Sequence, residues 1–101
     1  MASLQFQYVV RRHGQDPPPW AIRFTTTPSS NRIQVAEIGS GPVAEQNQSG
    51  ENGTDLRPGD WITEVNGQTR IPAIREEFRS AVVLHMSILR ERIGLLVEEP
   101  N

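Results

Sequence analysis

The side chains that most often perform acid, base or nucleophilic chemistry occur in this sequence, but they follow no catalytic spacing. The two histidines, His13 and His85, lie far apart, and no carboxylate spacing beside them suggests a metal site. The chain has no Gly-x-Ser-x-Gly elbow, no His-Glu-x-x-His helix and no phosphate-binding loop ending in Lys-Ser or Lys-Thr. Serines, histidines and acids still permit a hydrolytic triad, so an enzyme is the competing class. We expect a protein that is not an enzyme and needs no metal ion or other cofactor.

One segment of the sequence draws attention to the main chain instead, because it combines a stiff loop with the start of a strand. In the segment "RRHGQDPPPWAIRF", the three prolines Pro17–Pro19 stiffen the chain and remove amide donors until Trp20. Trp20, Ile22 and Phe24 then alternate with other residues, which is the pattern of a strand with one buried face. We expect a rigid loop that leads directly into a strand.

Further elements must hold this loop in place, and hydrophobic periodicity locates them. The ranges Leu4–Val10 and Ile33–Ile38 also alternate, so each predicts a strand. Pro42 suits the first position of a helix of one or two turns, because its fixed φ is already helical. In "LRPGDWITEVNG", Leu56–Gly67, a turn stands on each side of a short strand, Trp61–Val65. These elements predict a small, strongly curved sheet.

The second half of the chain predicts a short strand at Gln68–Ile71 and then a change to helical periodicity. The apolar stripe of a main helix, about Ala73–Leu89, consists of Ile74, Phe78, Ala81, Val82, His85, Met86 and Leu89. Ile93, Leu95 and Val97 predict a last strand, and the polar segment of residues 47–54 predicts a mobile surface loop. The resulting order, β-β-β-short α-β-β-long α-β, defines an α+β or mainly β fold.

Composition restricts the class of protein. A chain of 101 residues is expected to form one domain, residues 1–101, with a core of about residues 4–98. Its net charge of -2 and its ten scattered arginines lack the basic field that nucleic-acid binding needs. No apolar run approaches the length of a membrane span, and the absence of cysteine is compatible with a reducing cytoplasm. We expect a soluble, cytoplasmic monomer.

Three motifs in the same order resemble the PDZ family of peptide-recognition domains. The most specific consists of Leu56, Gly59, Asp60, Ile62, Val65, Asn66 and Gly67. "PPPWAIRF" stands where the family has its carboxylate-binding loop, and "GSGPVAE" is similar to the start of the family's short helix. The resemblance implies a PDZ-like six-stranded β-sandwich, a partial barrel with one short and one long helix.

The resemblance also implies a function, namely that the domain binds the C-terminal peptide tail of another protein by β-strand addition between its second strand and its long helix. The peptide-binding residues it implies are Trp20, Ala21, Ile22, Arg23, Phe24, Arg79, Val83 and Met86. An alignment shifted by one residue replaces the last three with Phe78, Val82 and His85. With Arg79 at the helix start, a ligand with an acidic residue opposite it is expected.

One departure from the family pattern supports an alternative role. Ala21 stands where the family usually has a glycine, and its methyl group can crowd a carboxylate or disfavour a positive φ. The alternative is a PDZ-like scaffold or regulatory domain of a larger protein, for example a protease, whose groove is occluded or used internally.

Overall fold

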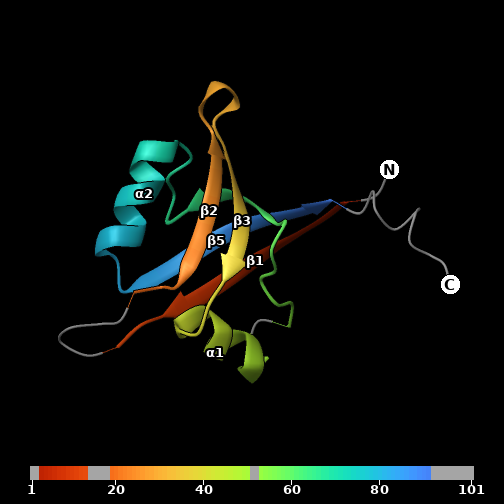
Figure 1. The fold of residues 1–101 in the computed structure, drawn as a ribbon, viewed down its shortest axis with the longest axis vertical. Helices are drawn as coiled ribbons and strands as arrows, with labels where there is room; N and C mark the ends of the chain where they lie inside the picture. The colour runs from red at the N-terminus through yellow and green to blue at the C-terminus, as the bar shows by residue number, and fades with distance from the viewer. Residues whose placement is uncertain (1–2, 14–18, 51–52, 92–101) are drawn as a thin grey trace, which may run out of the picture.

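One antiparallel sheet and two helices form the part of the chain that the computed structural model describes, residues 3–13, 19–50 and 53–91 (Figure 1). The strands are β1 (Ser3–Arg11), β2 (Ile22–Thr27), β3 (Arg32–Ile38), β4 (Trp61–Val65) and β5 (Val83–Glu91), and the helices are α1 (Pro42–Ser49) and α2 (Ile71–Ser80). A 3-10 turn, η1 (Pro28–Ser30), joins β2 to β3. The strand order is β1-β5-β4-β3-β2, so β1 and β2 form the two edges of the sheet.

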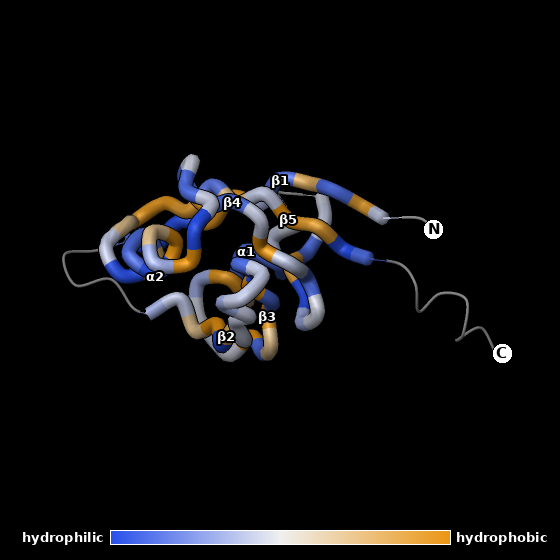
Figure 2. The backbone as a smooth tube through the Cα atoms, turned by 90° about the horizontal axis from the view of Figure 1, so that it is seen from above, coloured by the Kyte–Doolittle hydropathy of each residue, from blue (hydrophilic) through white to orange (hydrophobic). Residues whose placement is uncertain are grey.

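The core lies between the inner face of this sheet and the two helices. Along β1 hydrophobic and hydrophilic residues alternate, as the sequence predicts (Figure 2). The buried hydrophobic residues are Tyr8, Val10, Trp20, Ile33, Val35, Val43, Leu56, Ile62, Val65, Ile71, Ile74, Leu84, Met86 and Ile88. They come from four of the strands, both helices and the connecting segments, so a single core holds the described elements together.

The two turns around β4 have the conformations that their residues predict. Gly59 has φ 96°, and Asn66 and Gly67 have φ 51° and 84°. The main-chain N–H of Gly59 donates to the carbonyl of Val35 at 2.7 Å, which fixes the first turn against β3. The side chain of Asp60 is buried and binds Arg90 of β5, with Nε–Oδ1 at 2.7 Å and Nη2–Oδ2 at 2.8 Å.

The predicted main helix is wrong in its length. α2 begins at Ile71 and ends at Ser80, and residues Val83–Glu91 form strand β5 instead of the second half of a helix. β5 pairs with β1 on one side and with β4 on the other. Leu84, Met86 and Ile88 are buried at every second position, which is the period of a strand.

The described sheet has five strands and is open, so the six-stranded partial barrel is not what the described residues form. The predicted strand at Gln68–Ile71 is reduced to one isolated bridge between Val65 and Gln68, because Ile71 already begins α2. The predicted last strand, Ile93–Val97, lies outside the described residues. The expected contrast between a short and a long helix is also small, because α1 has 8 residues and α2 has 10.

The start of α1 agrees with the sequence, but its end does not. Pro42 occupies the first turn as predicted, and the helix continues to Ser49, where Gly50 ends it with φ 71°. The first residues of the predicted loop at 47–54 are therefore helical. Asn47 is a fixed residue, because its Oδ1 accepts hydrogen bonds from the Tyr8 hydroxyl at 2.6 Å and from the Leu56 N–H at 3.0 Å.

Candidate functional site

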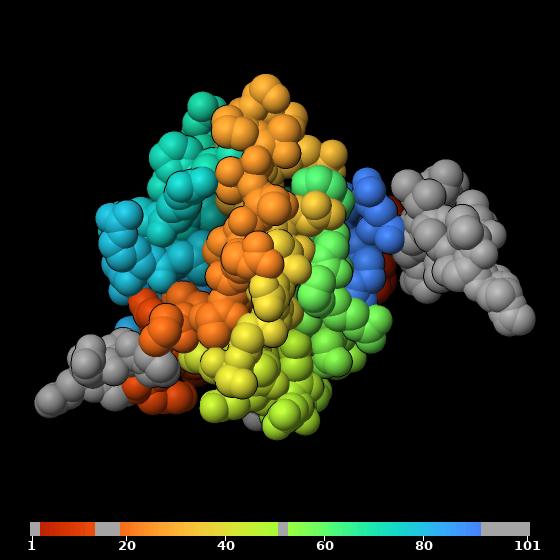
Figure 3. Space-filling view, in the orientation of Figure 1, coloured from red at the N-terminus to blue at the C-terminus, as the bar shows by residue number. Residues whose placement is uncertain are grey.

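The candidate site is a groove between edge strand β2 and helix α2. These two elements lie next to each other on one face of the molecule (Figure 3). The groove has a volume of about 280 Å³ and is lined by Phe24, Thr26, Ile33, Ile74, Arg75 and Phe78. Along β2 the side chains of Ile22, Phe24 and Thr26 are half-buried, whereas the residues between them are exposed. One side of β2 therefore faces α2, and within the described residues only β3 pairs with this strand.

Two aromatic rings meet across this groove. The ring centroids of Phe24 on β2 and Phe78 on α2 lie 4.6 Å apart, with the planes tilted by 48°. Both rings are partly buried and pack against the core. The contact joins the strand to the helix and limits the space for a ligand side chain at this point.

The loop before β2 contains a residue in the left-handed region. Ala21 has φ 62°, a conformation that glycine adopts at lower cost. A glycine in the connection from β3 to α1 makes room for its methyl group: a Cβ built on Gly41 would lie only 2.9 Å from the Ala21 Cβ, whereas one on Gly39 would make an ordinary contact with it at 3.8 Å. The Gly39 N–H also donates to the Ala21 carbonyl at 2.8 Å. The alanine thus keeps the turn that the sequence led us to expect of a glycine.

The main-chain donors of this loop are not used internally by the part of the chain that the structure describes. Neither Trp20 nor Ala21 donates its main-chain N–H to another described residue. The prolines Pro17 and Pro18 lie outside the described residues. Two consecutive N–H groups at the end of a groove form a site at which an anionic oxygen can accept hydrogen bonds.

Trp20 is a buried anchor and does not line the groove. Its side chain is only 5% exposed, and its indole N–H donates to the Phe78 carbonyl at 2.9 Å. The Arg12 guanidinium lies over the indole, 4.5 Å from its centroid, and its Nε donates to the Ala81 carbonyl at 3.0 Å. These contacts hold the loop at the C-terminal end of α2.

The structure places the remaining predicted site residues in several different environments. Arg23 is exposed on the other side of β2, where its Nη2 lies 2.6 Å from Glu37 Oε1. Arg79 is exposed near the end of α2 and pairs with Glu76 at 3.1 Å. Neither arginine lines the groove.

The expected positions of Val83 and Met86 on the wall of a helix are wrong. Both residues belong to β5, and Met86 is completely buried in the core. In the shifted alignment, Phe78 does line the groove, whereas His85 is an exposed residue of β5. Val82 precedes that strand and is 54% exposed.

Sequence reasoning missed Thr26, Ile33, Ile74 and Arg75 as groove residues. Arg75 Nη2 donates to Thr26 Oγ1 at 3.3 Å, which is a direct contact between the helix and the strand. Ile74, Arg75 and Phe78 follow the i, i+1, i+4 spacing of one helical face, so the sequence contained a usable signal. This signal was not used because the helix was expected to extend too far, so that the residues expected to face the ligand began at Arg79.

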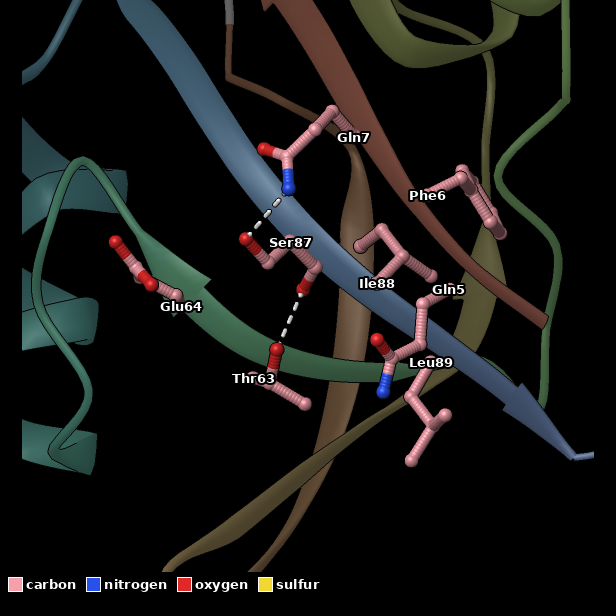
Figure 4. A pocket seen from close by; sticks show the side chains of 8 residues that line it. All are labelled: Gln5, Phe6, Gln7, Thr63, Glu64, Ser87, Ile88 and Leu89. Atoms are coloured by element: carbon pink, nitrogen blue, oxygen red, sulfur yellow. Dashed lines mark hydrogen bonds between the residues drawn. The ribbon is translucent and has the colours of Figure 1, made fainter. Parts of the chain in front are cut away.

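A second hollow, of about 420 Å³, lies on the outer face of β1, β5 and β4 (Figure 4). The Gln7 amide donates to the Ser87 hydroxyl at 3.0 Å, and the Thr63 hydroxyl donates to the Ser87 carbonyl at 3.1 Å. These polar groups therefore bind one another. The unused main-chain donors of Trp20 and Ala21 lie beside β2, so we place the candidate site in the groove.

The titratable groups of the described residues lie mainly outside the groove. Burial, and secondarily the nearby Asp55 charge, raises the pKa of the Tyr8 hydroxyl above its usual value. Hydrogen bonding to Asp60 raises the pKa of Arg90. Within the described residues no group of three or more histidine or acidic side chains could hold a metal ion, and no helix is long and apolar enough to cross a membrane.

A five-stranded antiparallel sheet with a helix beside an edge strand, and a tight loop before that strand, defines the class of fold: it is the fold of a PDZ domain. The crystal structure of MUPP1 PDZ4 is similar to this structure with a TM-score of 0.66 at 16% sequence identity, over 90% of this chain and 79% of that chain. No family model and no curated protein matches the sequence. The PDZ-like architecture expected from the three motifs is thereby confirmed.

Proposed function

We propose that this domain binds the C-terminal tail of a partner protein as an added β-strand between β2 and α2. The observation that carries the proposal is the open edge of β2 beside an apolar groove. An unpaired strand edge offers a row of main-chain donors and acceptors to an extended peptide, and the adjoining pocket distinguishes its side chains. A binding module of this kind is not an enzyme and needs no cofactor.

The end of the groove supports recognition of a free carboxylate. In this proposal the N–H groups of Trp20, Ala21 and Ile22 point toward the terminal carboxylate of the ligand. Each charge-assisted hydrogen bond to such an anion is worth about 1.5–3 kcal/mol. Because Trp20 is held by the Phe78 carbonyl and by Arg12, the loop loses little freedom on binding.

The Phe24–Phe78 contact determines where the terminal side chain of the ligand goes. With centroids 4.6 Å apart, the two rings leave no room for a side chain between them. The terminal side chain therefore packs on top of the pair, next to Ile22, and small or medium apolar residues fit best. We expect micromolar affinity, which is typical of a small transient interface.

The experiment is a titration of the ¹⁵N-labelled domain with pairs of peptides that differ only in a free or an amidated C-terminus. The free peptides should shift the amide signals of Ala21 and Ile22 and of β2, whereas the amidated peptides should bind at least tenfold more weakly. Equal binding of both forms would show that the loop does not recognise a carboxylate and would overturn the proposal.

The same aromatic contact favours one alternative role. If the Phe24–Phe78 pair keeps the groove closed, the domain acts as a scaffold or regulatory part of a larger protein. The variant Phe78→Ala distinguishes the two roles, because it removes the ring from the groove. Binding by the variant but not by the parent domain would establish the closed groove, whereas binding by the parent domain excludes it.

A further inference from the structure

Arg75 supplies a charge to a groove that is otherwise lined by apolar side chains and one hydroxyl group. The other lining residues are Phe24, Thr26, Ile33, Ile74 and Phe78. The guanidinium donates one hydrogen bond, from Nη2 to Thr26 Oγ1 at 3.3 Å. Since a guanidinium carries five N–H donors, most of its hydrogen-bonding capacity is available to a ligand.

The charge of Arg75 has no internal counter-ion among residues 3–13, 19–50 and 53–91. The nearest acids along the helix have other partners: Glu76 pairs with Arg79 at 3.1 Å, and Glu77 accepts a hydrogen bond from Asn66 Nδ2 at 2.9 Å. Arg75 differs in this respect from Arg23, Arg79 and Arg90, which each pair with a carboxylate. The groove therefore presents an uncompensated cation.

The geometry of β2 indicates which ligand residues can reach this cation. Side chains in a strand alternate between its two faces, so a ligand paired with β2 turns every second side chain toward α2. If its last residue lies beside Ile22, the next groove-facing residues lie opposite Phe24 and Thr26. These are the second and fourth residues before the last one, and both are near Arg75.

We propose that the groove selects tails with an aspartate or glutamate at one of these two positions, bound by the Arg75 guanidinium and the Thr26 hydroxyl. This inference rests on the proposed function, since it names the ligand class of the same groove. A guanidinium is suited to the role because its planar donors match both oxygens of a carboxylate. The expected acidic preference thus moves from Arg79 to Arg75, one helical turn earlier.

The test uses a set of free C-terminal peptides in which one glutamine at a time is replaced by glutamate, at the second, third or fourth position before the last residue. We expect glutamate at the second or fourth position to strengthen binding about fivefold, and this gain to diminish with added salt. In Arg75→Gln the gain should disappear. Arg79→Gln is the matched control, because Arg79 is also exposed on α2 but does not line the groove, and it should keep the gain.

The outcomes separate this inference from the function on which it rests. If free peptides bind better than amidated ones but glutamate gives no gain, or the gain survives in Arg75→Gln, the acidic preference is overturned and carboxylate recognition remains. An Arg75-dependent gain at the third position, which faces away from α2, would also overturn it. If free and amidated peptides bind equally, both proposals are overturned.

Discussion

Ala21 has a methyl side chain in a backbone conformation that usually belongs to glycine. The resemblance predicts a turn at this position in which glycine is usual. An alanine there can either change the turn or adopt the same turn with a strained backbone. The structure has the strained turn, with φ 62°, and Gly41 provides the space for the methyl group. That result depends on a glycine about twenty residues away, so the residues of the loop alone do not predict it.

The variant Ala21→Gly should be slightly more stable than the parent domain. The left-handed conformation costs alanine about 1–2 kcal/mol, and the greater unfolded-state entropy of glycine offsets about 0.4–1 kcal/mol of that gain. We expect a net increase of about 0.5–1 kcal/mol in the free energy of unfolding, measured by urea denaturation. Ala73→Gly, within helix α2, is the control and should lose about 0.5–1 kcal/mol. Equal losses in the two variants would contradict the left-handed assignment.

Tyr8 allows a test by pH, because it is the only tyrosine of the chain. Its buried hydroxyl donates to Asn47 Oδ1 at 2.6 Å, and burial raises its pKa. The unfolded chain loses this proton near pH 10 while the folded domain retains it, so the stabilising contribution is complete below about pH 10 and is lost as pH rises further. Tyrosinate absorbance should therefore appear only as the domain unfolds. Ionisation near pH 10 with the tryptophan circular dichroism unchanged would contradict the buried site.

At the level of elements, the short stretch from Leu56 to Gly67 was read correctly, because its turns depend on local residue types. Gly59 and the pair Asn66-Gly67 require or tolerate positive φ, and the structure has it at all three positions. The end of α2 was missed for a physical reason. Ser80 and Ala81 give no strong stop signal, and Val82, His85, Met86 and Leu89 follow the i, i+3, i+4, i+7 spacing of a helical stripe, although they lie before and within strand β5.

The ion pair Asp60–Arg90 joins the turn before β4 to strand β5, and its removal should be costly. The Asp60 side chain is 2% exposed and that of Arg90 is 19% exposed. Asp60→Asn leaves a partly buried guanidinium without its counter-ion, so we expect the free energy of unfolding to fall by about 2–4 kcal/mol in urea denaturation. Glu37→Gln breaks the exposed pair with Arg23 and should cost less than about 1 kcal/mol. Similar losses in the two variants would contradict a structural role for the buried pair.

At the level of the whole molecule, the sheet order distinguishes two kinds of strand. Within the described residues, β5 is hydrogen-bonded to a strand on each side, β1 and β4, whereas β2 is hydrogen-bonded only to β3. We expect the amide hydrogens of β5 to exchange most slowly with solvent and those on the open side of β2 to exchange quickly. Exchange measured by NMR with and without a bound tail should show protection gained on the open side of β2 and at the N–H groups of Trp20 and Ala21. Slow exchange throughout β2 in the free domain would contradict an open edge.

The overall architecture was predictable to a useful degree because three motifs occur in a fixed order along the chain. The groove was predictable on its β2 side, where Phe24 follows from strand alternation. Its α2 side was not, because the residues that face β2 depend on where the helix begins and ends. The sequence predicts Phe78 in the groove only in the shifted alignment, and it predicts no role there for Arg75.

The buried position of Trp20 gives the domain an intrinsic optical probe. Its indole is held between Arg12 and the Phe78 carbonyl, directly beside the loop that would receive a ligand. The second indole, Trp61, lies under Arg32 at 3.8 Å and does not line the groove. A change in emission that vanishes in Trp20→Phe but survives in Trp61→Phe would report occupancy without any attached dye, so ligand screening could start with the unlabelled protein.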